Sequence, residues 1–156
     1  MTDSPRVLIV EARFYEDIAD QLVTGASHVL ETAGISFDRV DVPGVFELPA
    51  AVNFAVQSGI NRTAPVDYAG ILALGCVIRG ETDHYDHICR ETSRALMELT
   101  LDHCLAFGFG VLTCENGEQA RVRANPTGDK NVGGKAATAC LRMLEIKTSF
   151  GLTRHE

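Results

Sequence analysis

The sequence lacks long apolar runs, a charged leader and a surplus of basic residues. No stretch approaches the roughly 20 apolar residues of a membrane helix, and the polar start Met1–Pro5 does not resemble a signal peptide. Lysine and arginine number 14 against 21 acidic residues, for a formal net charge of −7. This balance argues against nucleic acid as a partner, because nucleic-acid-binding proteins usually present basic faces to phosphates. Neither nucleic acid nor a membrane is therefore expected to bind, and local donors must meet any anionic ligand.

Cysteines are odd in number, which excludes a disulfide framework that pairs them all. They are scattered through apolar stretches, as Cys76, Cys89, Cys104, Cys114 and Cys140. Such a distribution is typical of reduced, buried thiols, and it favours a cytoplasmic protein.

Short apolar runs alternate with segments of helical periodicity along the whole chain. The expected strands are Arg6–Val10, Ile35–Val42, Tyr68–Ile78 and Ala106–Cys114. The expected helices cover Ile18–Ala33, Pro49–Ser58, Ile88–Leu99, Asn116–Ala124 and Ala137–Leu144. The alternation predicts an α/β fold of three layers (αβα), a flavodoxin-like, doubly wound, four-stranded parallel sheet with helices on both faces. Its 156 residues fit one domain, 1–156.

In such a sheet ligands bind beyond the carboxyl ends of the strands, so the loops there are the candidate site. Phe14 follows the first strand and can stack on a planar ring, or it can simply cover the base of the next helix. Val45, Phe46 and Glu47 follow a Pro-Gly turn after the second strand. Glu47 can accept hydrogen bonds from hydroxyl groups, or merely favour the start of a helix.

The loop after the third strand leads into a histidine at the start of the next helix. Free N–H groups near Glu81 and Thr82 can cradle a phosphate there. Histidine titrates near neutrality, so His84 is a candidate for proton transfer, with a capping or surface role as the alternative. A zinc site with His87 and Cys89 is not expected, because Cys89 lies on another helical face and no CxxC pair is present.

A small basic group stands near the carboxyl end of the chain: Arg121, Arg123, Lys130 and Lys135. If these side chains converge they form an anion site. Otherwise they are solvated surface residues of the ordinary kind.

Two stretches are especially distinctive. Gly75–Asp86 reads Gly-Cys-Val-Ile-Arg-Gly-Glu-Thr-Asp-His-Tyr-Asp, and Pro43–Pro49 reads Pro-Gly-Val-Phe-Glu-Leu-Pro. Together with Arg13-Phe14, Thr113–Asn116 and Glu118–Ala120, they resemble the signatures of the 6,7-dimethyl-8-ribityllumazine synthase family in order and spacing.

This resemblance implies a condensation of two small molecules, 5-amino-6-(D-ribitylamino)uracil and 3,4-dihydroxy-2-butanone 4-phosphate. Imine formation, phosphate loss, ring closure and dehydration give 6,7-dimethyl-8-ribityllumazine, the penultimate step of riboflavin biosynthesis. None of these steps needs a cofactor or a metal. The protein supplies proximity and proton transfer.

The resemblance also implies a role for each loop. Phe14 stacks on the pyrimidine ring, and the backbone of Val77 and Ile78 reads the ring edge. The ribityl chain is held by one turn, made of Val45, Phe46 and Glu47. The phosphate is cradled by Glu81 and Thr82, while His84 shuttles protons. A neighbouring subunit of a homo-oligomer completes the site with Phe109 and with Arg123 as phosphate ligand.

Two departures from the family pattern bear on phosphate binding and assembly. Val132 stands where the family has a lysine, which leaves Lys130 as a nearby substitute. The stretch Ala124–Asp129 is one residue longer than in shell-forming members and contains Pro126. The resemblance implies a homo-oligomeric ring of five chains, a homopentamer. With only Met1–Pro5 ahead of the first strand, the longer stretch with Pro126 predicts that this ring does not build a shell.

Two other classes of function remain as alternatives. A catalytically weak homologue that binds a lumazine or flavin, or serves as a scaffold, would be favoured by loss of His84 or Arg123, and both are present. A signalling or electron-transfer domain would need an acidic cluster or a Ser/Thr-rich loop after the first strand. Glu11–Phe14 provides neither.

Overall fold

Four parallel strands form the centre of the computed structural model, which describes residues 4–152. They are β1 (Arg6–Ala12), β2 (Ser36–Val42), β3 (Gly70–Ile78) and β4 (Phe107–Cys114), in the order β2-β1-β3-β4. All three pairs of neighbours are parallel. Of the amino-terminal segment considered above, residues 1–3 lie outside the described part.

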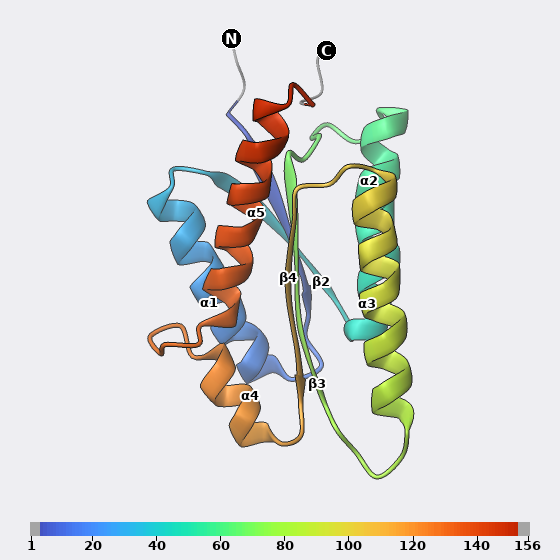
Figure 1. The fold of residues 1–156 in the computed structure, drawn as a ribbon, viewed down its shortest axis with the longest axis vertical. Coiled ribbons are helices and arrows are strands. Elements are labelled where there is room, and N and C mark those ends of the chain that lie inside the picture. Colours follow the sequence, from blue (N-terminus) through green and yellow to red (C-terminus); the bar gives the residue numbers. More distant parts are fainter. Residues whose placement is uncertain (1–3, 153–156) are drawn as a thin grey trace.

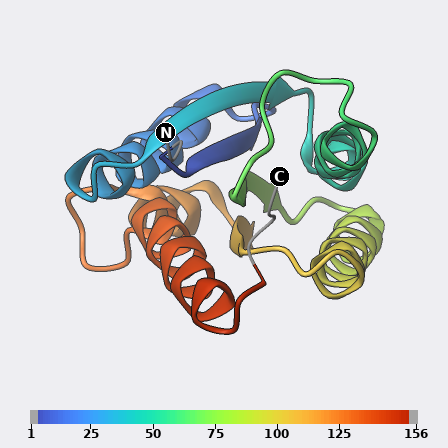
Figure 2. The same ribbon diagram turned by 90° about the horizontal axis from the view of Figure 1, so that it is seen from above.

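Helices cover both faces of this sheet. They are α1 (Glu16–Thr32), α2 (Leu48–Asn61), α3 (His84–Asp102), α4 (Gly117–Ala124) and α5 (Val132–Ser149), with a short 3-10 helix, η1 (Val45–Glu47), before α2. Figure 1 and Figure 2 show α1, α4 and α5 on one face and α2 and α3 on the other. The three-layer, doubly wound fold predicted from the sequence is confirmed. None of the described helices is long and apolar enough to cross a membrane.

Each face of the sheet has its own apolar core. Successive residues of a strand point to opposite faces, so Val7 and Ile9 pack in the core beneath α1 and α5, while Leu8 and Val10 pack in the core beneath α2. Burial on both faces explains why these strands appear in the sequence as continuous apolar runs.

Helix α5 approaches its neighbours through glycines. A Cβ atom at Gly133 would lie 2.1 Å from the carbonyl oxygen of Leu22 in α1. A Cβ atom at Gly108 in β4 would lie 2.2 Å from the carbonyl oxygen of Ala136 in α5. Because no side chain fits in either place, backbone packs directly on backbone, and α5 closes the layer that also holds α4.

The expectation of buried thiols is only partly correct. All five cysteines are free, and Cys76, Cys114 and Cys140 are buried. Burial raises the pKa of the Cys76 and Cys140 thiols to about 12, which makes them poor nucleophiles. Cys89 is half-buried, and Cys104 is exposed because it lies in the turn before β4 with a positive φ of 50°.

An ionic cluster joins β1, β2 and the segment before β3 at the amino edge of the sheet. The Arg6 guanidinium donates to both oxygens of Asp38, at 2.5 and 2.8 Å, and the Tyr68 hydroxyl donates to Asp38 at 2.8 Å. The hydrogen bond from Arg6, reinforced by the one from Tyr68, lowers the pKa of Asp38 from 3.8 to about 2.

The lowered pKa of Asp38 predicts a contribution to the free energy of unfolding that disappears in acid. The pKa is lower in the folded than in the unfolded chain, so this contribution is fully present above about pH 4 and is lost as pH falls toward 2. At pH 7 the Asp38→Asn variant should melt at a lower temperature than the wild type, and the gap should narrow as pH falls. Thermal unfolding followed by circular dichroism checks this, and a gap that stays constant would contradict it.

Candidate active site

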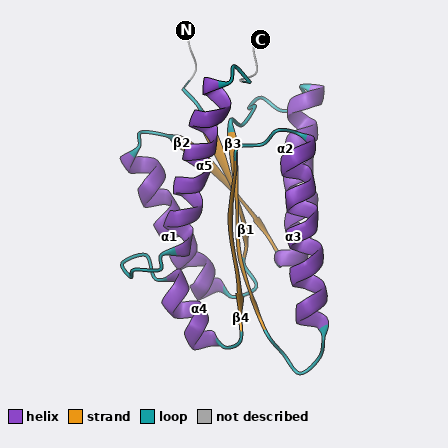
Figure 3. Cartoon of the chain, in the orientation of Figure 1, coloured by secondary structure: helices purple, strands orange, loops and turns teal. Residues whose placement is uncertain are grey.

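All four strands end at the same edge of the sheet, and the loops that follow them meet there. Figure 3 shows the loops after β1, β3 and β4 toward the end of the molecule opposite the two chain ends. One chain thereby gathers Phe14, the η1 turn, the end of β3 and the start of α3 at one edge. These are four of the segments that the sequence analysis singled out.

Phe14 presents its ring to solvent. Its side chain is 72% exposed, and its described ring contact is an edge-on one with Tyr15, at 5.0 Å between centroids. The ring therefore does not cover the base of α1, which was the alternative. An exposed aromatic face at this edge is free to stack on a planar ligand.

The η1 turn is anchored on β3 by Val45. Val45 is only 5% exposed, and a Cβ atom at Gly75 would lie 2.8 Å from it, so the turn rests on glycine backbone. Phe46 points outward and is 63% exposed. The Glu47 carboxylate accepts a hydrogen bond from the backbone N–H of Gly44 at 3.1 Å and closes the turn. Backbone groups and the two outward side chains are thus what the turn can offer a ligand.

Arg79 fixes the loop between β3 and α3, a role that the sequence analysis missed. Its guanidinium donates to Glu115 at 3.0 Å and to Asp86 at 3.3 Å, and it lies 4.3 Å from the centroid of the Tyr85 ring. Its backbone N–H donates to the Cys114 carbonyl at 2.9 Å. The position of Arg79 in the middle of the Gly75–Asp86 motif could have drawn attention to it. Its partner Glu115, which follows β4, is brought close only by the fold.

His84 is the first residue of α3, as predicted, and its side chain is exposed. Its backbone N–H donates to the Thr82 hydroxyl at 3.3 Å. Glu81 and Thr82 are exposed in the preceding loop, while Val77 and Ile78 are half-buried at the end of β3. The amino end of a 19-residue helix favours an anion, and the exposed imidazole of His84 lies at this end.

Phe109, Arg123 and Lys130 do not join this group within one chain. Phe109 is 45% exposed and stands five residues before the end of β4, roughly 16 Å back along the strand at about 3.3 Å per residue. Arg123 lies on α4, on the opposite face of the sheet from His84 (Figure 1), and donates to the Gln119 carbonyl at 3.3 Å. Lys130 is exposed in the loop before α5.

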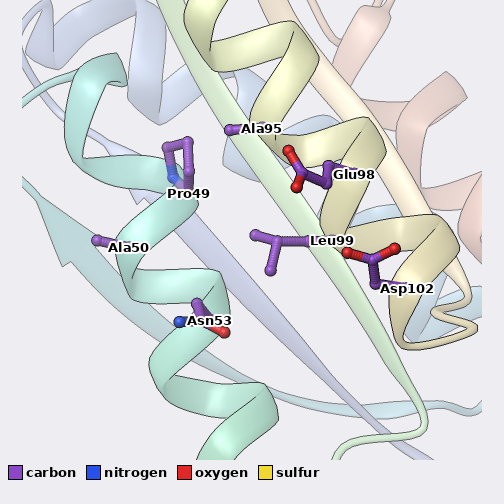
Figure 4. A pocket seen from close by; sticks show the side chains of 7 residues that line it. All are labelled: Pro49, Ala50, Asn53, Ala95, Glu98, Leu99 and Asp102. Atoms are coloured by element: carbon purple, nitrogen blue, oxygen red, sulfur yellow. The ribbon is translucent and has the colours of Figure 1, made fainter.

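Two grooves lie between α2 and α3. The larger, about 320 Å³, is lined by Pro49, Ala50, Asn53, Ala95, Glu98, Leu99 and Asp102, and Figure 4 shows Leu99 pointing into the space between the helices. The second, about 270 Å³, includes Phe46 and the buried Thr92, whose hydroxyl has no hydrogen-bond partner in the described structure. Neither groove is lined by Phe14 or His84.

Comparison with known proteins gives one consistent result. The family model described as 6,7-dimethyl-8-ribityllumazine synthase matches residues 4–148. A protein of that name from Bartonella tribocorum is 51% identical, over 99% of this chain and 97% of its own length. The same name belongs to a relative from Paramagnetospirillum magneticum, 46% identical over 95% of this chain and 98% of its own length. A relative from Rhizobium meliloti, named 6,7-dimethyl-8-ribityllumazine synthase 1, is 51% identical over 93% of both chains.

The Arg79 contacts predict that this residue holds the loop in front of His84. Arg79→Ala should speed amide hydrogen exchange in residues 80–86 by roughly three- to tenfold, because several partners lose their donor at once. Arg142→Ala, which removes an exposed ion pair with Glu145 on α5, is the control. Equal exchange in residues 80–86 of both variants would show that Arg79 does not hold the loop.

Proposed function

The chain belongs to the 6,7-dimethyl-8-ribityllumazine synthase family, and we propose that the loops at the carboxyl edge of its sheet carry out the condensation for which that family is named. As a transferase of riboflavin biosynthesis it joins 5-amino-6-(D-ribitylamino)uracil to 3,4-dihydroxy-2-butanone 4-phosphate. The observation that carries the proposal is that segments bearing the family's signatures lie far apart in the sequence and meet at one edge of the sheet.

The pyrimidine substrate is bound by the first two loops and the end of β3. The exposed ring of Phe14 stacks on the pyrimidine, and the backbone of Val77 and Ile78 reads its edge. Val45, Phe46 and Glu47 hold the ribityl chain, with Glu47 accepting hydrogen bonds from its hydroxyls. Glu47 already closes the η1 turn, so its carboxylate is held in place before the substrate arrives.

The phosphate-bearing substrate is bound at the start of α3. Backbone N–H groups near Glu81 and Thr82, aided by the helix dipole, cradle the phosphate. His84 takes and returns the protons that imine formation, phosphate loss and dehydration require. The reaction consists of condensation and elimination steps, and the proposal assigns it no cofactor.

A second copy of the chain completes the site with Phe109 and Arg123. This is supported by their placement, one back along β4 and the other on the opposite face from His84. It is supported further by exposed apolar side chains on α2 and α3, where Phe54 is 71%, Met97 59% and Leu101 69% exposed. Large apolar side chains exposed on two neighbouring helices are consistent with an interface on this face.

The assembly is proposed to be a homopentamer that does not build a shell. A heterologous interface that closes by rotation gives a ring. The loop between α4 and α5, which contains Pro126 and Lys130, projects outward beside α1 (Figure 1). We infer that this loop prevents the tight contact between rings that a shell requires. Lys130 is the proposed auxiliary phosphate ligand, because it is exposed at the end of this loop.

The remaining parts of the proposal concern location and domain structure. A cytoplasmic location is supported by the five free thiols. One domain, 1–156, carries the function. The weakly catalytic binding homologue is not favoured, because His84 and Arg123 are both retained and the relatives carry the enzyme's name.

An assay with both substrates, followed by the fluorescence of the lumazine product, tests the function. The wild type should form product, and His84→Ala should lower kcat by about 10²-fold, within the range of a general acid or base. Arg123→Ala should chiefly raise the KM for the phosphate-bearing substrate, through the loss of a charge-assisted hydrogen bond. No product from the wild type at high concentration would favour the binding homologue.

Sharing of the site between copies predicts complementation. Mixed oligomers of His84→Ala and Arg123→Ala chains should recover part of the wild-type activity, because some interfaces then combine an intact His84 with an intact Arg123. Mixed oligomers, verified by mass, that stay as inactive as either parent would count against a shared site.

The ring proposal predicts the mass of the particle. Sedimentation at neutral pH should give a mass near five chains. A particle near sixty chains would contradict the absence of a shell, and ten chains would mean that two rings meet face to face.

A further inference from the structure

Glu11 is a buried carboxylate in a strand that is otherwise apolar from Val7 to Ala12. It is only 3% exposed, and its oxygens accept three hydrogen bonds. Arg13 donates one at 2.8 Å, and Arg39 donates two at 2.8 Å. A buried ion pair is often no more stabilising than apolar residues of the same volume. Its place beneath the site therefore points to a role beyond stability.

Arg13 links Glu11 to the first loop. The same guanidinium that Glu11 holds also donates to Glu16 at 3.1 Å and to Asp20, both on α1. The backbone N–H of Arg13 donates to the Val42 carbonyl at 3.0 Å. These contacts bridge the turn that carries Phe14. The Phe14 ring is exposed, so its own packing does little to fix its position.

Arg39 links Glu11 to the strand that leads into the second loop. It lies on the edge strand β2, three residues before Val42, at which that strand ends. Its hydrogen bonds with Glu11 raise the pKa of its guanidinium. Glu11 thus ties Arg13, in the loop that carries Phe14, to the strand that leads into the η1 turn. The loop before His84 is tied separately, by Arg79 to Glu115 and Asp86.

We propose that Glu11 is a positioning residue for the pyrimidine substrate, acting through Arg13 and Arg39 without touching that substrate. This inference rests on the proposed function. Because the phosphate-binding loop has its own anchor, loss of Glu11 should weaken one substrate and spare the other. A purely structural role would affect both substrates together.

The test compares Glu11→Gln with Asp38→Asn. Each variant neutralises a carboxylate that holds an arginine between β1 and β2, Glu11 at the carboxyl edge and Asp38 at the amino edge. In Glu11→Gln the KM for the pyrimidine should rise about tenfold, while the KM for the butanone phosphate stays within about twofold. In Asp38→Asn both KM values should stay near wild type although the melting temperature falls.

The outcomes separate the inference from its alternatives. A similar rise in both KM values, or a selective rise in Asp38→Asn as well, would overturn it. If Glu11→Gln does not fold, the Arg39→Gln variant tests the inference instead. The Arg39 side chain is 48% exposed, and Glu11 retains its ion pair with Arg13, so this variant should fold. That variant should show a smaller selective rise, and no rise would overturn the inference.

An inactive wild type would refute the proposed function rather than the positioning role. In that case amide exchange in residues 13–15 decides. It should be faster in Glu11→Gln than in Asp38→Asn, and equal rates would overturn the inference.

Discussion

Parallel pairing of the four strands is the constraint on which the rest of the structure depends. It requires a helix to return the chain between strands, so both faces of the sheet are covered and both must be apolar. It also places every strand end at one edge, which brings together loops that are far apart in the sequence. The same geometry puts α3 and α4 on opposite faces, so His84 and Arg123 of one chain are separated by the sheet. In the proposed assembly, a second copy of the chain brings an Arg123 to the His84 of the first.

Most of the ion pairs around the sheet lie near the ends of its strands. In a protein with a formal net charge of −7, several arginines are tied to carboxylates at the ends of the strands. Arg13 lies in the first loop, Arg39 lies on the strand before the second, and Arg79 lies in the loop before α3. These arginines are engaged with the protein itself, so a phosphate must rely on backbone N–H groups and on cations from elsewhere. Arg123 of a neighbouring copy fits that need.

The strands and the layered fold were predictable from the sequence, because buried parallel strands are continuous apolar runs, such as Ile71–Cys76. The start of α3 at His84 followed from the position of the histidine after the third strand. The 3-10 geometry of the η1 turn was not predicted, because three residues between Gly44 and the next helix carry no periodicity. Glu11 could not be recognised as an anchor either, because its partner Arg39 is 28 residues away and meets it only through the pairing of β1 with β2. The roles assigned to Phe109 and Arg123 came from the family resemblance, since their distance from His84 within one chain gives no reason to join them.

We propose above that two copies of the chain share each site. A structure of the assembled protein with the lumazine product bound tests it most directly. The account predicts that each product contacts Phe14 of one chain and Phe109 of another. A product whose contacts all come from a single chain would contradict it.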